Sequence, residues 1–278
     1  MDFSAVDLTS NLTDEEKLEK AKARCERLCD MENNREGSLV GYDCRECKNK
    51  GYLIKPQLYM NNYQEVQVNC KCMKIRKTLS ALRRSGLEDV VHKYTFQKYI
   101  ITEEWQKGVM DIAQRYLKSA DNSWFFYGGT SGCGKTHICT AIAISLLKRG
   151  NEVKYMLWRD EASRLKARVN DVSYGEFVDV YKNVDVLYID DFFKTGKGEH
   201  QSKQRPTPAD INLAFEILNS RVAKKKITII SSECTLADIV EIDEAVAGRI
   251  KEMCGEHFVN VAKDVTKNYR LRGTSNEV

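Results

Sequence analysis

Proline and long apolar runs are scarce in this chain. Only three prolines occur among its 278 residues. No apolar run approaches the roughly 18 to 20 residues that cross a bilayer. The first residues, MDFSAVDLTS, have neither the basic start nor the apolar centre of a secretion signal. We therefore expect a protein that has no membrane partner and stays in the cytoplasm.

Neither the composition nor the net charge is extreme. Hydrophobic residues make up 42% of the chain and charged residues 30%, which is typical of a globular protein. The length is enough for one large domain, or for a large and a small one. A net charge of +4 is mild, so any surface that binds nucleic acid has to be local. The sequence contains no internal repeat and no low-complexity segment.

Cysteine is abundant, with ten residues, but disulfides are not expected in a chain that lacks an export signal. A CxxC and a CxC pair are formed by Cys44, Cys47, Cys70 and Cys72. Four thiolates in two close pairs suit a tetrahedral Zn²⁺ ion in a closed structural site. Cys25 and Cys29 are one helical turn apart. Because the four ligand positions are already supplied, we favour packed core thiols for this pair over a metal role.

From residue 124 onward, apolar strand-like runs alternate with helical stretches. The expected strands cover residues 124–127, 152–158, 184–190, 227–231 and 257–261. Strands that alternate with helices form a parallel sheet covered on both faces. Near the N-terminus, Thr13 and Glu16 form a capping box that opens a helix. We expect an N-terminal helix and a small zinc-binding module in residues 1–80, and an α/β domain in residues 81–278.

A cluster of glycines ends in a Lys-Thr pair between the first expected strand and a helix. The stretch GTSGCGKT fits the pattern G-x-x-x-x-G-K-[ST]. Such a loop surrounds phosphate oxygens with backbone N–H donors, and the helix directs its positive end at the same phosphates. Lys135 is expected to reach the β and γ phosphates, and the Thr136 hydroxyl to bind Mg²⁺. The residues expected to contact ATP are Gly129, Thr130, Ser131, Gly132, Cys133, Gly134, Lys135, Thr136 and His137.

The second half of the expected site is the run VDVLYIDDFF, a buried strand that ends in two carboxylates. Asp190 is placed to hold Mg²⁺ through a water, and Asp191 to orient and polarise the attacking water. A carboxylate that positions water favours hydrolysis of ATP over phosphoryl transfer. A strand followed by an ordinary acidic turn is the simpler alternative.

Together, GKTHICTAIAISLLKRGNEVKYMLW, VLYIDD and EILNSRVAKKKITIISSE resemble the AAA+ ATPases of the DnaC/DnaI helicase-loader family. The resemblance covers roughly residues 40 to 272. It implies the five-stranded parallel P-loop core of the AAA+ (ASCE) class, without the usual C-terminal helical lid and with a cysteine segment ahead of it. It further implies an ATPase that loads a DnaB-type hexameric replicative helicase onto single-stranded DNA at replication initiation.

The resemblance also assigns roles to individual residues. ITIISSE corresponds to the sensor 1 strand, where the family usually has Ser-Asn and this chain has Ser232 and Glu233. Ser231 or Ser232 is then the replacement contact to the γ-phosphate. Arg249 corresponds to the arginine finger that acts on the neighbouring subunit, which implies an ATP-dependent oligomer. Arg270 corresponds to sensor 2, with Arg272 as the second choice.

Three basic stretches are candidates for contact with phosphates: residues 71–84, the run RLKAR, and residues 194–205. A solvated charged face is the simpler interpretation of each. RLKAR is favoured, because it follows the second core strand and carries three cations, Arg164, Lys166 and Arg168, with no acid between them. Binding there is expected to be electrostatic. The zinc module, by resemblance, contacts the helicase.

Other functions remain open. One is a transposition-helper ATPase of the IstB type, which shares the core and the missing lid. Another is a nucleotide-gated adaptor that binds ATP and scarcely hydrolyses it. A small-molecule P-loop kinase is less favoured, because no basic lid segment is found. Cys133 lies at a helix N-terminus, where a thiolate is stabilised, so it is either a redox switch on ATP binding or an ordinary loop residue.

We predict slow basal hydrolysis. The Asp191 side chain is one methylene shorter than the glutamate often found in this role, so its reach to the water is poor. Steady-state phosphate release by the protein alone should stay below about 10 s⁻¹. A much faster turnover would contradict the assignment of a timer.

Overall fold

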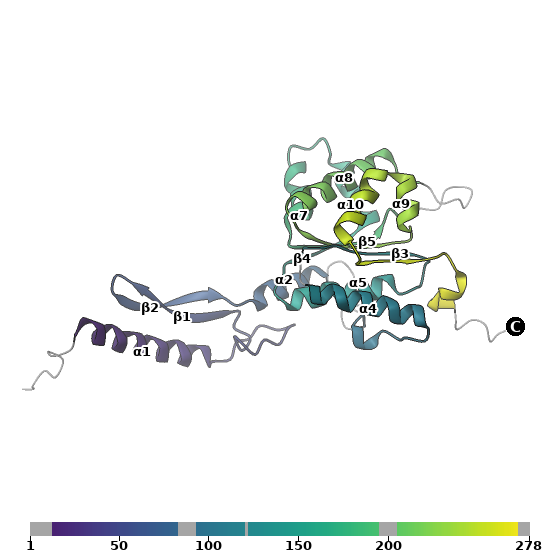
Figure 1. The fold of residues 1–278 in the computed structure, drawn as a ribbon. Coiled ribbons are helices and arrows are strands. Elements are labelled where there is room, and N and C mark those ends of the chain that lie inside the picture. Colours follow the sequence, from purple (N-terminus) through teal and green to yellow (C-terminus); the bar gives the residue numbers. More distant parts are fainter. Residues whose placement is uncertain (1–12, 83–92, 120–121, 195–204, 272–278) are drawn as a thin grey trace, which may run out of the picture. The chain divides into compact units, whose positions relative to one another are not determined.

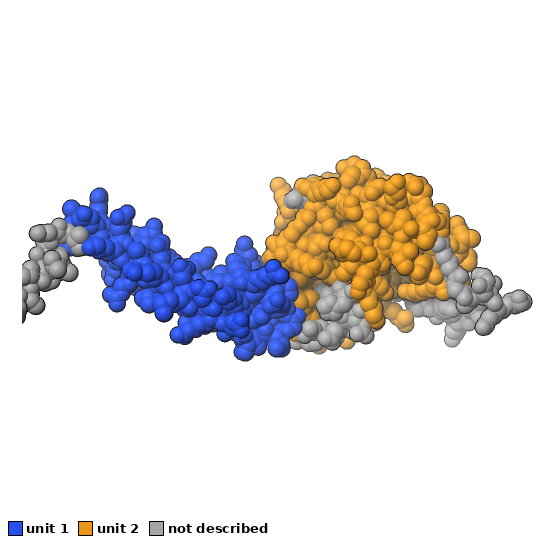
Figure 2. All heavy atoms as spheres, turned by 90° about the horizontal axis from the view of Figure 1, so that it is seen from below, with its two compact units in different colours: residues 1–76 blue, residues 77–278 orange. Residues whose placement is uncertain are grey.

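The computed structural model describes residues 13–82, 93–119, 122–194 and 205–271. The chain divides into two compact units, Met1–Arg76 and Lys77–Val278 (Figure 2). Each unit has its own sheet. Within the described ranges, none of the helices is long and apolar enough to cross a membrane.

Unit 1 consists of a helix, a hairpin and a cysteine-bearing turn. Helix α1 (Asp14–Asn33) begins at the predicted capping box, in which Glu16 N donates to Thr13 Oγ1 at 3.3 Å. Strands β1 (Tyr52–Tyr59) and β2 (Asn62–Asn69) pair antiparallel. They are joined by Met60 and Asn61, both with positive φ. Helix α1 packs along this hairpin (Figure 1). Helix α2 (Cys72–Leu82) follows and runs across the boundary between the units.

Unit 2 is built on a five-stranded parallel sheet, as the sequence predicted. Its strands, with their bounds, are β3 (Phe125–Gly129), β4 (Val153–Leu157), β5 (Val186–Phe192), β6 (Ile227–Ser232) and β7 (Phe258–Val261). Their order in the sheet is β4-β5-β6-β3-β7. The strand before the glycine loop and the strand that ends in the two aspartates therefore lie on either side of β6.

Helices cover both faces of this sheet (Figure 1). On one face lie α4 (Glu104–Ser119) and α5 (Lys135–Lys148). The other face is covered by α6 (Trp158–Ala167), α7 (Tyr174–Asn183), α8 (Pro208–Ala223), α9 (Leu236–Ile242) and α10 (Glu244–Cys254). A short turn, η2 (Phe96–Lys98), precedes α4. In residues 262–271, the described part after β7, the regular elements are the two 3₁₀ turns η3 (Val265–Lys267) and η4 (Tyr269–Leu271).

The central strands are mostly apolar because helices cover them on both sides. Every residue of β3 is buried, as are the first five residues of β5. Aromatic side chains fill the core between the sheet and the helices on the α8 side, where the rings of Phe192 and Phe193 stack with centroids 4.0 Å apart. This packing anchors the end of β5, which carries the two aspartates.

A fully buried arginine ties the end of α7 to the start of β6. The side chain of Arg221 has no exposed surface. Its nitrogens donate to Thr228 Oγ1 and to the backbone carbonyls of Tyr181, Val184, Asp185 and Ile227. Burial lowers the pKa of Arg221 to about 9, with the charge of Asp185 opposing the shift, so the guanidinium remains charged at neutral pH.

We predict that Arg221→Met destabilises unit 2 by about 3 kcal/mol or more, because each buried acceptor left unpaired costs about 1–3 kcal/mol. All three tryptophans of the chain lie in unit 2, so tryptophan fluorescence during urea unfolding reports on it. Arg115→Met removes an exposed arginine of α4 and should shift stability by no more than about 0.5 kcal/mol. Equal effects of the two changes would show that the buried network is unimportant.

Candidate nucleotide-binding site and metal site

The glycine loop leaves β3 in a conformation that requires glycine. Gly129 has a φ of 132° and Gly132 a φ of 74°. A Cβ atom on Gly129 would lie 2.0 Å from the carbonyl oxygen of Val261, and one on Gly132 would lie 1.9 Å from Asn268 Oδ1. Only glycine fits these positions. Helix α5 then begins at Lys135, so its first N–H groups face the loop.

Lys135 is buried beside the loop that it follows. Its Nζ atom donates to the carbonyl oxygens of Gly129 at 3.1 Å and Thr130 at 2.8 Å. The ammonium group is therefore held against the loop backbone, where it favours an anion.

Asp190 joins three strands and α5 through hydroxyl groups. Its Oδ1 atom accepts from Thr136 Oγ1 at 3.3 Å and also from Ser231 Oγ. Its Oδ2 atom accepts from Tyr155 OH at 3.0 Å. Burial and the charge of Asp190 raise the pKa of Tyr155, so the phenol remains a donor. The predicted Mg²⁺ ligands Thr136 and Asp190 are thus in direct contact, whereas the sequence contains no signal that singles out Tyr155.

Asp191 occupies strained backbone at the end of β5, with a φ of 54°. Its carboxylate accepts from Lys194 Nζ at 2.9 Å, and the same ammonium lies 3.2 Å from Glu233 Oε1. Burial works to lower the pKa of Lys194, but hydrogen bonds and charge from Asp191 and Glu233 raise it overall. Lys194, which the sequence offered only as part of a basic stretch, thus connects Asp191 and Glu233, the two acidic positions that depart from the family pattern.

Most of these groups line a cavity of about 370 Å³, but of the predicted set Gly129, Thr130 and Asp190 are outside its lining. From the predicted set it is lined by Ser131, Gly132, Cys133, Gly134, Lys135, Thr136, His137, Asp191 and Arg270. Its other described lining residues include Lys194, Glu233 and an aromatic wall made of Tyr94, Tyr99, Trp105 and Tyr269. The wall was not predicted, although three of its four aromatic residues lie within residues 94–105, just ahead of the glycine loop.

His137 connects α5 to this aromatic wall. Its Nε2 atom lies 2.8 Å from the carbonyl oxygen of Thr95, and its ring stacks on Tyr94 with centroids 4.9 Å apart. Burial lowers the pKa of His137, while the hydrogen bond to Thr95 opposes the shift. The imidazole is therefore neutral at pH 7, and it supports the wall.

Two predicted features differ from the expectation: the hydroxyl of Ser232 does not reach the cavity, and the thiol of Cys133 is not stabilised as a thiolate. Ser232 is fully buried and its hydroxyl donates to the carbonyl oxygen of Phe192 at 2.7 Å, outside the cavity lining. Cys133 does line the cavity, but burial raises its pKa despite the opposing charge of Lys135. The expectation of a stabilised thiolate at Cys133 is therefore wrong, because burial outweighs the helix terminus.

The two predicted arginines differ in position. Arg270, on η4, lines the cavity. Arg249, on α10, is outside the lining, with its Nε atom 3.0 Å from Asn219 Oδ1 and its guanidinium 4.2 Å from the Phe215 ring centroid. The alternative candidate Arg272 lies outside the described residues.

The three cations of RLKAR do not act as one surface. Lys166 pairs with Asp210 of α8. Arg164 pairs with Glu161 at 2.8 Å, and the guanidinium of Arg168 lies 4.2 Å from the Phe177 ring centroid. Both arginines, with Lys154, line a groove of about 370 Å³ that excludes Lys166. Of the other basic stretches, residues 83–84 and 195–204 lie outside the described ranges.

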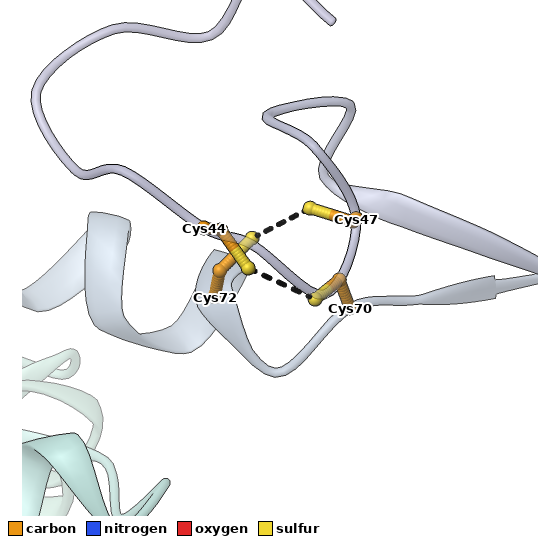
Figure 3. A group of neighbouring side chains, drawn as sticks. All are labelled: Cys44, Cys47, Cys70 and Cys72. Atoms are coloured by element: carbon orange, nitrogen blue, oxygen red, sulfur yellow. Dashed lines mark hydrogen bonds between the residues drawn. The ribbon is translucent and has the colours of Figure 1, made fainter. Parts of the chain in front are cut away.

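In unit 1, the four predicted cysteines converge on one point (Figure 3). Their sulfur atoms all lie within 4.8 Å of one another, with Cys44–Cys70 at 3.8 Å and Cys47–Cys72 at 3.4 Å. A tetrahedral Zn²⁺ ion with bonds of about 2.3 Å has sulfur–sulfur edges of about 3.8 Å, so the donor set fits zinc.

The turn at the cysteines favours metal binding. Gly51, with a φ of 85°, donates its N–H to Cys47 Sγ at 3.3 Å. Burial opposes ionisation of Cys47, but hydrogen bonds from Gly51 and the neighbouring thiols lower its pKa to about 7. Cys25 and Cys29 are buried on α1 and are not part of this cluster, as predicted.

Comparison with known proteins supports the interpretation of unit 2. Residues 90–255, more than half of the chain, match the bacterial DnaA ATPase domain. The phage-like element PBSX protein XkdC of Bacillus subtilis (strain 168) is 31% identical over 250 residues, covering 86% of this chain and 90% of that protein.

Two further similarities concern a helicase loader. The replicative helicase loader DnaC of Escherichia coli (strain K12) is 30% identical over 125 residues, covering 44% of this chain and 50% of that protein. A crystal structure of the DnaC helicase loader superposes with a TM-score of 0.53 at 20% identity, covering 62% of this chain and 98% of that chain. This structural likeness shows a shared fold.

We predict one zinc ion per chain, and loss of the fold of unit 1 when it is removed. Among the described residues of this unit, the buried apolar side chains are six cysteines and Ile75, so little else stabilises it. Cys44→Ser should abolish stoichiometric zinc, measured by mass spectrometry of metals, and expose unit 1 to limited proteolysis. Cys25→Ser, which changes a buried cysteine outside the cluster, should keep the zinc. Full metal content in Cys44→Ser would refute the site.

Proposed function

Because the chain belongs to the bacterial DnaA ATPase-domain family, as a DnaC-like AAA+ replication protein, we propose that it is an ATP-dependent helicase loader. It binds a DnaB-type hexameric replicative helicase and delivers it to single-stranded DNA. Slow Mg²⁺-dependent hydrolysis of ATP acts as the timer. One observation carries the nucleotide chemistry: Thr136 hydrogen-bonds Asp190 at a cavity that the glycine loop shares with Asp191 and Arg270.

In the proposed site, ATP binds with its phosphates on the glycine loop. Backbone N–H groups and the start of α5 donate to phosphate oxygens, and Lys135 supplies a positive charge. Thr136 and Asp190 offer a hydroxyl and a carboxylate oxygen, the ligand types that Mg²⁺ prefers. When bound, the ion neutralises charge on the phosphates. The aromatic wall beside His137 offers flat apolar surfaces for the base.

Hydrolysis of ATP requires a group that orients the attacking water and groups that supply positive charge to the phosphates. Asp191 orients the attacking water from the end of β5, and Arg270 contributes positive charge from η4. Arg249 is outside the cavity of its own chain, which supports a role as the arginine finger of a neighbouring subunit. A complete site then needs an oligomer, and the isolated protein hydrolyses slowly.

The two units divide the remaining tasks. The zinc-ordered unit 1 docks on the helicase, while unit 2 binds nucleotide and single-stranded DNA. For DNA we retain Arg164 and Arg168 of the predicted set, because both line the groove on α6 and α7 together with Lys154. Lys166 contributes through its ion pair with Asp210, which joins α6 to α8.

A nucleotide-gated adaptor with little hydrolysis is the second candidate. It is favoured by the ion pair between Lys194 and Asp191, since a carboxylate engaged by an ammonium group polarises water poorly. An IstB-like transposition helper shares the core of unit 2 and makes no use of a replicative helicase.

Capture of the replicative helicase of the same organism tests the loader. We expect wild-type protein and Lys135→Ala to capture it, and Cys44→Ser to fail, because docking depends on unit 1 and timing on ATP. Cys25→Ser is the matched control and should bind normally. Capture is measured with ATP and without, and phosphate release is followed with helicase and DNA added. No capture by wild-type protein in any nucleotide state would favour the transposition helper. Capture without phosphate release would favour the adaptor.

A further inference from the structure

One ammonium group connects two carboxylates at the nucleotide cavity. Lys194, just after β5, lies 2.9 Å from Asp191 Oδ2 and 3.2 Å from Glu233 Oε1, and all three residues line the cavity. Resting on the ATP site proposed above, we infer that Lys194 is a further residue, beside Lys135, that recognises the γ-phosphate, and that Glu233 positions it.

The chemistry of the end of β6 requires such a cation. An ionised carboxylate accepts hydrogen bonds and cannot donate one to a phosphate oxygen. Glu233 therefore cannot make the contact that an amide makes at this position. Ser231 and Ser232 cannot replace it either, because both are fully buried, with the Ser231 hydroxyl on Asp190 and the Ser232 hydroxyl on the carbonyl oxygen of Phe192. Lys194 is the donor that Glu233 holds in the cavity.

The charges in the cavity lead to the same conclusion. Two carboxylates, Asp191 and Glu233, face a space that has to accept a polyphosphate. The negative charges of these carboxylates repel those of a bound polyphosphate and so oppose its binding. With Lys194 between them, the group of three carries one net negative charge instead of two. The lysine thus reduces the repulsion and offers N–H donors that the carboxylates lack.

The backbone is shaped to place Lys194 there. Asp191 and Phe193 both have positive φ, at 54° and 57°, which is unfavourable for residues other than glycine. Phe192 and Phe193 are buried in the core, whereas Asp191 and Lys194 line the cavity. Strain of this kind persists where packing over-determines it, often at functional sites.

Recognition of the γ-phosphate is also coupled to the water-orienting carboxylate. When ATP is bound, the γ-phosphate competes with Asp191 for Lys194, which frees Asp191 to orient water. When ADP is bound, Lys194 stays on Asp191. A hydrogen-bonded path connects this pair to the Mg²⁺ ligands, since Asp191 N donates to Ser231 Oγ at 3.2 Å and Ser231 donates to Asp190.

The test compares the affinities for ADP and for a non-hydrolysable ATP analogue. Titration calorimetry with Mg²⁺ is carried out on the full chain. We expect Lys194→Met to weaken binding of the ATP analogue about tenfold or more while ADP changes less than about twofold, because one charge-assisted hydrogen bond is lost only from the γ-phosphate. Lys194→Arg should retain most of the preference, and Glu233→Ala should lose part of it.

A matched control removes an ion pair outside the cavity. Lys263 lies 3.0 Å from Asp238 Oδ1, and Lys263→Met should leave both affinities unchanged. Tryptophan fluorescence confirms folding, and Lys194→Leu replaces Lys194→Met if Lys194→Met is unstable. If the lysine variants weaken both nucleotides equally, or neither, the assignment of Lys194 is overturned and the ATP site stands. If wild-type protein binds neither nucleotide, both the ATP site and the role of Lys194 are overturned.

Discussion

The site of unit 2 depends on one buried carboxylate that is hydrogen-bonded by hydroxyl groups from three other elements. Asp190 lies on β5 and accepts from α5, β4 and β6. Because an unpaired buried carboxylate is costly, these three hydroxyls are constrained to stay around it. These hydrogen bonds thereby hold the start of α5, which follows the glycine loop, in a fixed position relative to the strands that neighbour the cavity. The parallel order of the sheet makes this possible, since β5 and β3 both neighbour β6.

A second constraint acts at the residues that follow Asp190. Phe192 and Phe193 pack into the aromatic core, and the residues on both sides of Phe192 have positive φ. Asp191 and Lys194 consequently reach the cavity together and pair there. The carboxylate of Asp191 is engaged by an ammonium group, which agrees with the slow hydrolysis that we propose.

Unit 1 is stabilised in a different way. The described residues of its hairpin and helices bury few apolar side chains, and the cysteines take the place of a hydrophobic core. A bound metal can supply the missing stability, because its binding energy is also folding energy in a small module. We therefore expect the fold of this unit to depend on a bound metal, whereas unit 2 has a continuous core between its sheet and helices.

The sequence by itself determined the parallel α/β fold, the capping box of α1 and the meeting of four cysteines. Each of these follows from a short-range pattern: apolar runs covered on both faces, a Thr and Glu three residues apart, and paired thiols. The contact of Thr136 with Asp190, which are 54 residues apart, agrees with their prediction as Mg²⁺ ligands, because the two motifs have a fixed place in such a sheet. Only the tertiary structure decided that Lys194 links Asp191 to Glu233, that Tyr155 supports Asp190 and that Lys166 pairs with Asp210. These partners lie on separate elements, and their pairing depends on backbone strain and helix packing. Neither the backbone strain nor the helix packing can be predicted from the spacing of residues along the chain.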